Sequence, residues 1–172
     1  MEQVDNEVSI LHHEDMFLYD QPQINKMSEY ESIVRNSSID FIRLLRSVDD
    51  PTFPYRGSNT LFPIPTHSKY FFSVQPSICK TDSLIKIYKN TKINHLREFE
   101  IKVQQTCREL NVSGLFHYNN EQKSGMFHYD TSVYPYIATA IVKGQWNLSG
   151  YPKRLKHILD KYKIDTTLRG HV

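Results

Sequence analysis

Several features that would point to a chemistry are missing from this 172-residue sequence. The two cysteines, Cys79 and Cys107, stand 28 positions apart without a Cys-x-x-Cys pair, so neither a disulfide framework nor a zinc knuckle is predicted. Only 6 glycines occur, and they form no Gly-x-x-x-x-Gly-Lys or Gly-x-Gly-x-x-Gly phosphate loop and no Gly-x-Ser-x-Gly elbow. The sequence therefore does not indicate nucleotide-driven chemistry or a serine nucleophile of that type.

Long uncharged runs are also missing. The longest stretches without Asp, Glu, Lys or Arg, residues 57–68 and 131–142, both contain proline and are far shorter than the ~20 residues that a membrane-spanning helix needs. The first residues lack the basic and apolar regions of a signal peptide, so we expect a protein that is not secreted. With 39% hydrophobic and 23% charged residues, the composition excludes collagen-like and strongly charged disordered chains, and the length favours one domain.

Basic charge is absent from the N-terminal segment. Residues 1–25 contain six acidic side chains and neither Lys nor Arg, so the rest of the chain carries 21 basic against 13 acidic residues. Because the first residues also lack a sustained apolar period, we predict a flexible acidic tail over residues 1–35. The basic surplus elsewhere favours anionic partners such as nucleic acid, a lipid surface or an acidic protein segment.

The rest of the chain divides into two parts. Residues 36–67 are expected to form a short helix over about 39–48 and then a proline-rich linker, because four prolines fall within 15 residues. Residues 68–172 are expected to form a single compact α+β domain with a small, mostly antiparallel sheet flanked by helices. The apolar periods predict strands at 69–74, 115–118, 126–129 and 133–142, and helices near 81–88, 91–110 and 152–162.

The last of these helices is strongly amphipathic. Leu155, Ile158, Leu159 and Tyr162 form an apolar stripe, and the opposite face is basic. Such a helix can pack its stripe on the sheet and present its charges either to solvent alone or to an anionic membrane or acidic groove. The candidate binding residues on this face are Lys153, Arg154, Lys156, Lys161 and Lys163.

Two similar sequence segments, residues 115–118 and 126–129, suggest a metal site and hence an enzyme as an alternative. A hairpin joining strands 115–118 and 126–129 would bring His117 close to His128 and Asp130, which could together bind a divalent metal in a hydrolase. Partly buried histidines on paired strands are the commoner outcome of such a pattern. We therefore expect no catalytic residue, no metal and no cofactor. A metal-dependent hydrolase and a sequence-independent nucleic-acid-binding protein remain the two alternatives.

The order of elements from residue 68 onward resembles that of rhabdovirus matrix proteins, most closely the short ones of plant-infecting, cytorhabdovirus-like members. The similar features are a polar N-terminal tail, a proline-bearing link, the phrase Lys69-Tyr70-Phe71-Phe72-Ser73-Val74, and the aromatic run 133–142 ahead of a C-terminal element. The resemblance implies a non-enzymatic protein that self-associates and bridges the viral nucleocapsid to an anionic membrane. It also implies a location in the host cytoplasm and in the virion, at the inner face of the membrane.

Two departures from the family change what the resemblance implies. The better-known members have a lysine-rich tail, whereas this one is acidic, and no Pro-Pro-x-Tyr motif is present. We therefore expect the acidic tail to contact a basic face of a neighbouring copy, giving a homo-oligomer. We expect peripheral contact with a membrane or nucleocapsid and no small-molecule substrate. This contact would depend on the C-terminal basic helix and on a second basic group. That group consists of Lys86, Lys89, Lys92 and Arg97.

Overall fold

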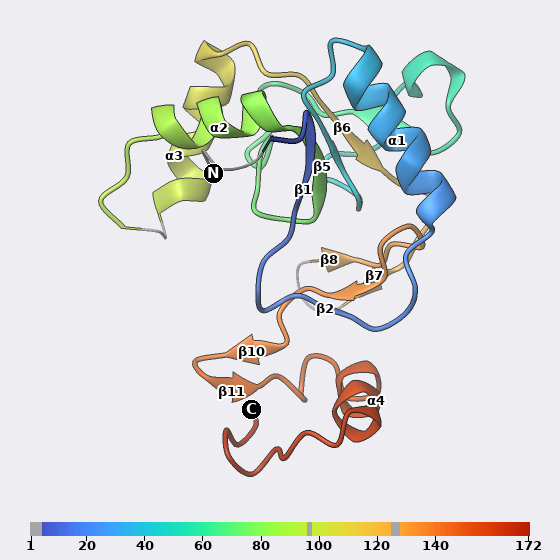
Figure 1. The fold of residues 1–172 in the computed structure, drawn as a ribbon, viewed down its shortest axis with the longest axis vertical. Coiled ribbons are helices and arrows are strands. Elements are labelled where there is room, and N and C mark those ends of the chain that lie inside the picture. Colours follow the sequence, from blue (N-terminus) through green and yellow to red (C-terminus); the bar gives the residue numbers. More distant parts are fainter. Residues whose placement is uncertain (1–4, 96–97, 125–127) are drawn as a thin grey trace.

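A mixed five-stranded sheet forms the centre of the computed structural model, which describes residues 5–95, 98–124 and 128–172 (Figure 1). Its pairings are antiparallel except for the parallel pair β3–β6. The predicted α+β class with a small, mostly antiparallel sheet flanked by helices is confirmed. In spatial order the strands are β1 (Val8–Leu11), β5 (Ser77–Lys80), β3 (Phe41–Arg43), β6 (Gly114–His117) and β4 (Leu61–Pro63).

Helices cover both faces of this sheet, so its strands carry apolar side chains in both directions. In β3 and β6, Ile42 and Leu115 belong to one apolar cluster, whereas Phe41 and Phe116 belong to another, as the two-residue period of a strand requires. The first cluster packs against α1 and the second against α2 and α3 (Figure 1). The helices are α1 (Ile24–Asn36), α2 (Thr81–Asn90) and α3 (Phe99–Glu109).

One glycine of the sheet is required by close packing. The aromatic ring of Phe41, which lies on the neighbouring strand, covers Gly114 so closely that a Cβ atom there would be 2.3 Å from the Cζ atom of Phe41. No real Cβ contact is that short, so a larger residue would displace the ring and with it the edge-on contacts of Phe41 with Phe71 and Phe72. Gly114 therefore fixes the pairing of β3 with β6.

A smaller unit lies below the sheet in Figure 1 and is called here the C-terminal lobe, residues 138–172. It has its own apolar cluster, in which Trp146 and Tyr151 pack with the buried face of its helix. The lobe contacts the rest of the molecule through Phe17, Tyr19 and Ile137, which pack in its cluster; Phe17 and Ile137 face each other in the pairing of β2 with β9. The short elements involved are β2 (Phe17–Leu18), β9 (Tyr136–Ile137), β10 (Ile141–Val142), β11 (Gln145–Trp146) and α4 (Arg154–Lys161).

The prediction of a flexible tail over residues 1–35 is wrong for residues 8–35, which contain β1, β2 and most of α1. Residues 1–4 lie outside the described part. The helix buries Met27, Tyr30 and Val34, whose spacing of three and four places them on one face. The polar residues between them conceal this pattern in the sequence, because they occupy the exposed face of the helix.

The predicted helix over 39–48 is also wrong, because this segment contains β3, which is a central strand of the sheet. Phe41, Ile42 and Arg43 are all buried, and the short apolar segment 41–45, interrupted only by Arg43, fits a buried strand as well as a helix. The proline-rich segment 51–65 is not only a linker, since it contains the edge strand β4.

Residues 69–74 do not form the predicted strand. Their backbone groups are bound by side chains instead of by a neighbouring strand: Gln104 of α3 donates to the carbonyl of Phe72 at 2.7 Å and accepts from its N–H at 3.1 Å. Arg43 donates to the carbonyl of Phe71 at 2.8 Å. Side chains far away in the sequence therefore take the place of the strand-to-strand hydrogen bonds that a two-residue apolar period normally indicates.

The remaining elements agree with the sequence in part. Helix α2 lies where it was predicted, α3 begins at residue 99 rather than near 91, and α4 lies within the predicted 152–162. The predicted hairpin of 115–118 with 126–129 is wrong, because β6 pairs with β3 and β4, whereas β8 pairs with β7 and residues 125–127 lie outside the described part. Two short strands, β9 and β10, take the place of the strand 133–142. The hairpin strands are β7 (Lys123–Ser124) and β8 (His128–Tyr129).

Candidate functional site

The charge of the molecule is divided between its two parts. The C-terminal lobe carries seven Lys or Arg and two Asp, a net charge of +5. Residues 1–137 carry fourteen Lys or Arg and seventeen Asp or Glu, a net charge of −3. Because the lobe lies at one end of the long axis in Figure 1, the excess positive charge is concentrated at that end of the molecule.

Helix α4 builds the basic surface as its sequence predicts, with one exception. Leu155, Ile158 and Leu159 are buried in the cluster of the lobe, so the opposite face of the helix is directed outward. Tyr162 does not belong to the buried stripe, because 65% of its side chain is exposed. The exposed basic residues are Lys153, Lys156, Lys161 and Lys163.

Arg154 and Lys156 have carboxylate partners within the protein. Arg154 forms a two-pronged ion pair with Asp130, and its guanidinium group lies over the ring of Tyr19 at 4.5 Å. The hydrogen bond with Asp130 raises the pKa of Arg154. This residue therefore joins the lobe to the rest of the molecule and is not an open binding charge. Lys156 is exposed but lies 3.2 Å from the carboxylate of Asp160.

Exposed apolar side chains lie among these charges and were not identified from the sequence. Leu168 is 84% exposed although the chain around it is ordered by backbone hydrogen bonds from Trp146 to Gly170 and from Val172 back to Trp146. Together with Tyr162, it adds apolar surface to the basic surface, a combination typical of proteins that lie on a lipid interface. The sequence signal is weak, because Leu168 is a single apolar residue in a polar segment.

The second predicted basic group lies far from the first. Lys86 and Lys89 are exposed on α2 and Lys92 follows it, at the opposite end of the long axis from α4 (Figure 1). Arg97 lies outside the described residues. The structure therefore does not bring the two groups together, and instead places them at the two ends of the molecule.

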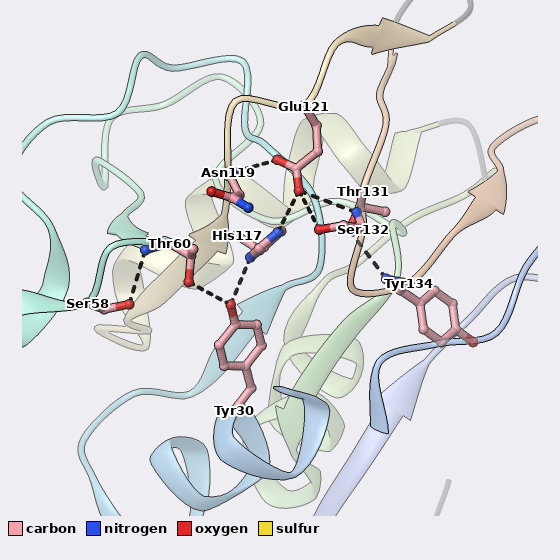
Figure 2. Close-up of polar contacts among 9 residues, drawn as sticks. All are labelled: Tyr30, Ser58, Thr60, His117, Asn119, Glu121, Thr131, Ser132 and Tyr134. Carbon is pink, nitrogen blue, oxygen red and sulfur yellow. Dashed lines mark hydrogen bonds and ion pairs between the residues drawn. The ribbon is translucent and has the colours of Figure 1, made fainter. Parts of the chain in front are cut away.

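A buried polar network surrounds His117, the residue at the end of β6 (Figure 2). Its Nδ1 atom is 2.8 Å from the hydroxyl of Tyr30 on α1, and its Nε2 atom is 2.9 Å from a carboxylate oxygen of Glu121. The same carboxylate accepts hydrogen bonds from the backbone N–H of Asn119 and from the hydroxyl of Ser132. The network thereby connects α1, the sheet and the segment that precedes β9.

The environment of this network shifts two pKa values. Burial by itself would raise the pKa of Glu121. The hydrogen bond and the charge of His117, together with the hydrogen bonds from Asn119 and Ser132, outweigh burial and hold the pKa at about 2. Burial raises the pKa of Tyr30 to about 12. Glu121 is thus an ionised buried carboxylate, and its donors account for its stability in the interior.

The predicted metal triad is not assembled. Both ring nitrogens of His117 have protein partners, and Asp130 is bound by Arg154. The side chain of His128 lies outside the described part. Within residues 5–95, 98–124 and 128–172, no three His, Cys, Asp or Glu side chains are grouped as a metal site would require. Among the same residues, no helix combines the length and the hydropathy needed to cross a bilayer.

Comparisons of this chain with protein-family models, with curated proteins and with solved structures found no match. The resemblance to rhabdovirus matrix proteins therefore stays a prediction from the sequence.

Proposed function

We propose that this protein is a non-enzymatic, matrix-type structural protein that docks peripherally on an anionic membrane through its C-terminal lobe and presents its opposite end to a viral nucleocapsid. The observation that carries the proposal is the division of charge, with a net charge of +5 in the lobe and −3 in residues 1–137. An anionic membrane attracts the lobe more strongly than residues 1–137, so it orients the molecule as well as binding it, and the local basic group on and after α2 stays free for a second polyanion.

The lobe supplies the two contributions that peripheral membrane binding needs. Lys153, Lys161 and Lys163 are exposed, and each basic side chain near an anionic leaflet contributes about 1 kcal/mol. Leu168 adds an apolar side chain that can enter the interface between headgroups and acyl chains. Several such contributions together give reversible binding that weakens as the salt concentration rises.

The position of the lobe supports a bridging role. The ion pair of Arg154 with Asp130, which directly follows β8, ties the docking surface to the rest of the molecule. Helix α2, which carries Lys86 and is followed by Lys92, then lies toward the far end of the molecule, where a polyanion such as a nucleocapsid can be reached while the lobe is on a membrane (Figure 1). The same separation of charge favours head-to-tail contacts between copies, which we expect to be sensitive to salt.

The test is sedimentation with vesicles that contain phosphatidylserine, at ~0.1 M salt, where the Debye length is about 10 Å. The variant Lys161→Glu/Lys163→Glu replaces two attractive charges with repulsive ones, so we expect its affinity to fall by about 10- to 100-fold. The matched control Lys86→Glu/Lys92→Glu changes the net charge equally but at the other end of the molecule. We expect it to change vesicle binding by less than about threefold, because α2 lies toward the opposite end of the molecule from the lobe and salt screens its charges.

Three results would contradict the proposal. Equal loss in both variants would mean that only total charge matters. Unchanged binding of the lobe variant, with an unchanged circular dichroism spectrum, would mean that the basic face is merely solvated. Tighter binding of the wild-type protein to single-stranded RNA than to vesicles at the same salt concentration would favour a nucleic-acid-binding protein instead.

A further inference from the structure

A cation is buried in the main sheet without a matching anion. Arg43, the last residue of β3, is 3% exposed. Its guanidinium group donates to the carbonyls of Tyr70 and Phe71 at 2.7 and 2.8 Å and to the hydroxyl of Ser47 at 3.3 Å. Within the described part of the chain, its Nε–H has no hydrogen-bond partner, and no carboxylate lies within ion-pair distance of the group.

This arrangement is incomplete on energetic grounds. A buried charge is normally paired with an opposite charge, because its loss of hydration is otherwise uncompensated. Carbonyl oxygens and a hydroxyl offset part of this cost for Arg43, and the nearby carboxylates are engaged elsewhere: Asp49 accepts from Ser47, and Glu100 accepts from the backbone N–H of Val74. Burial lowers the pKa of Arg43 to about 10, so the group remains charged at neutral pH.

A cavity is lined in part by Arg43. Its volume is about 380 Å³, within the range of sites that take small molecules. Arg43 and Glu100 contribute to its lining, and Leu45, Val48 and Tyr70 supply apolar surface. The cavity is therefore a mainly apolar space whose lining includes a buried arginine that has no ion-pair partner in the described residues.

A second arginine lies at the same cavity. Arg46 is held between the rings of Tyr118 and Tyr129, with its guanidinium carbon 4.8 and 4.6 Å from their centroids. Its own ion pair is with Asp50, whose side chain is almost fully exposed, and its Nε–H is buried without a partner in the described residues. Among the residues that line the cavity, Arg43 and Arg46 are positive and Glu100 is negative, so the lining itself carries one net positive charge.

We propose that this cavity binds a monocarboxylate with a short aliphatic chain. The carboxylate would be held by the guanidinium groups of Arg43 and Arg46, in the planar geometry that arginine offers to carboxylates. The aliphatic chain would lie against Leu45, Val48 and Tyr70. One net positive charge matches one carboxylate, and the apolar lining matches an alkyl chain rather than a sugar or nucleotide.

The experiment is calorimetric titration of the full chain with octanoate at neutral pH, with 1-octanol as the uncharged probe of the same length. We expect saturable binding of octanoate and at least about tenfold weaker binding of octanol, because the alcohol lacks the charge-assisted hydrogen bonds. Shortening the probe to hexanoate removes two methylene groups and should weaken binding by up to about fourfold for each.

Val48→Asp is the diagnostic variant, because Val48 is 59% exposed at the cavity and can be changed without disturbing the core. The new carboxylate would compete for the arginines and repel the probe, so we expect octanoate binding to be lost. Leu168→Asp is the matched control, since it places the same side chain at an exposed apolar position of the lobe. It should weaken vesicle binding and leave octanoate binding unchanged, which separates this proposal from the membrane proposal.

Binding of octanol as tight as that of octanoate would show an unspecific apolar pocket and overturn the proposal. The same conclusion would follow if Val48→Asp bound octanoate like the wild type, or if the wild type gave no heat of binding at millimolar octanoate.

Discussion

The five-stranded sheet and the C-terminal lobe differ in how they bury apolar surface. The sheet carries an apolar cluster on each face, and its strands come from segments between residues 8 and 117. The lobe has one small cluster and strands of two residues each. The lobe is also the part with the positive net charge and with Leu168 exposed. The region that we assign to docking is thus stabilised by fewer contacts than the sheet that supports it.

Truncating one fully buried side chain in each part is the strongest way to test this difference. Phe116→Ala in the sheet should lower the free energy of unfolding by about 3–5 kcal/mol, and Leu155→Ala in the lobe by about 2–5 kcal/mol. We expect the first change to weaken protection from amide hydrogen exchange throughout the chain. The second should raise exchange mainly within residues 138–172, because the lobe has its own cluster. Uniform loss in Leu155→Ala would mean that the two parts form one cooperative unit.

Gly114→Ala should destabilise the sheet by about 3 kcal/mol, because the added Cβ atom would overlap the ring of Phe41. The comparable glycine of the lobe is Gly150, where a Cβ atom would meet the end of the Asn147 side chain at 2.7 Å. That side chain can shift, although it would weaken its hydrogen bonds with the N–H of Gly150 and the carbonyl of Thr139, so Gly150→Ala should cost less than Gly114→Ala. Urea denaturation of both variants measures the difference. Equal losses would contradict the close packing of β3 against β6.

Acid stability should depend on Glu121. Its pKa is held at about 2 in the folded protein against an ordinary value of 4.5, so its stabilising contribution is complete above about pH 4.5 and is lost as the pH falls toward 2. We expect this contribution to be on the order of 2 kcal/mol. In Glu121→Gln, the free energy of unfolding should be lower at neutral pH and should change less between pH 4.5 and 2. The control Glu109→Gln, at an exposed position of α3, should keep the wild-type pH dependence.

The sequence predicted the fold class and the helices that carry a clear apolar face, such as α2 and α4. It failed where burial comes from distant partners. Residues 69–74 have the period of a strand, but Gln104 and Arg43 bind their backbone, and no local pattern contains that information. Residues 39–48 were assigned to a helix because Phe41, Leu44, Leu45 and Val48 have the spacing of one helical face. The same short segment fits a buried strand, which is what residues 41–43 form.

The candidate site was predicted in the same uneven way. The outward direction of Lys153 and Lys161 followed from the buried stripe of α4, because one face of an amphipathic helix determines the other. The pairing of Arg154 with Asp130 joins residues 24 positions apart and was not foreseen. The exposure of Leu168 could not be predicted either, since a single apolar residue carries no period.

The most direct test of the docking account is hydrogen exchange of the protein free and bound to phosphatidylserine vesicles. The account predicts that binding protects residues 153–172 and leaves the amides of α2 and of the five-stranded sheet unchanged, because only the basic lobe faces the membrane. Protection centred on α2, or spread evenly over the chain, would contradict it.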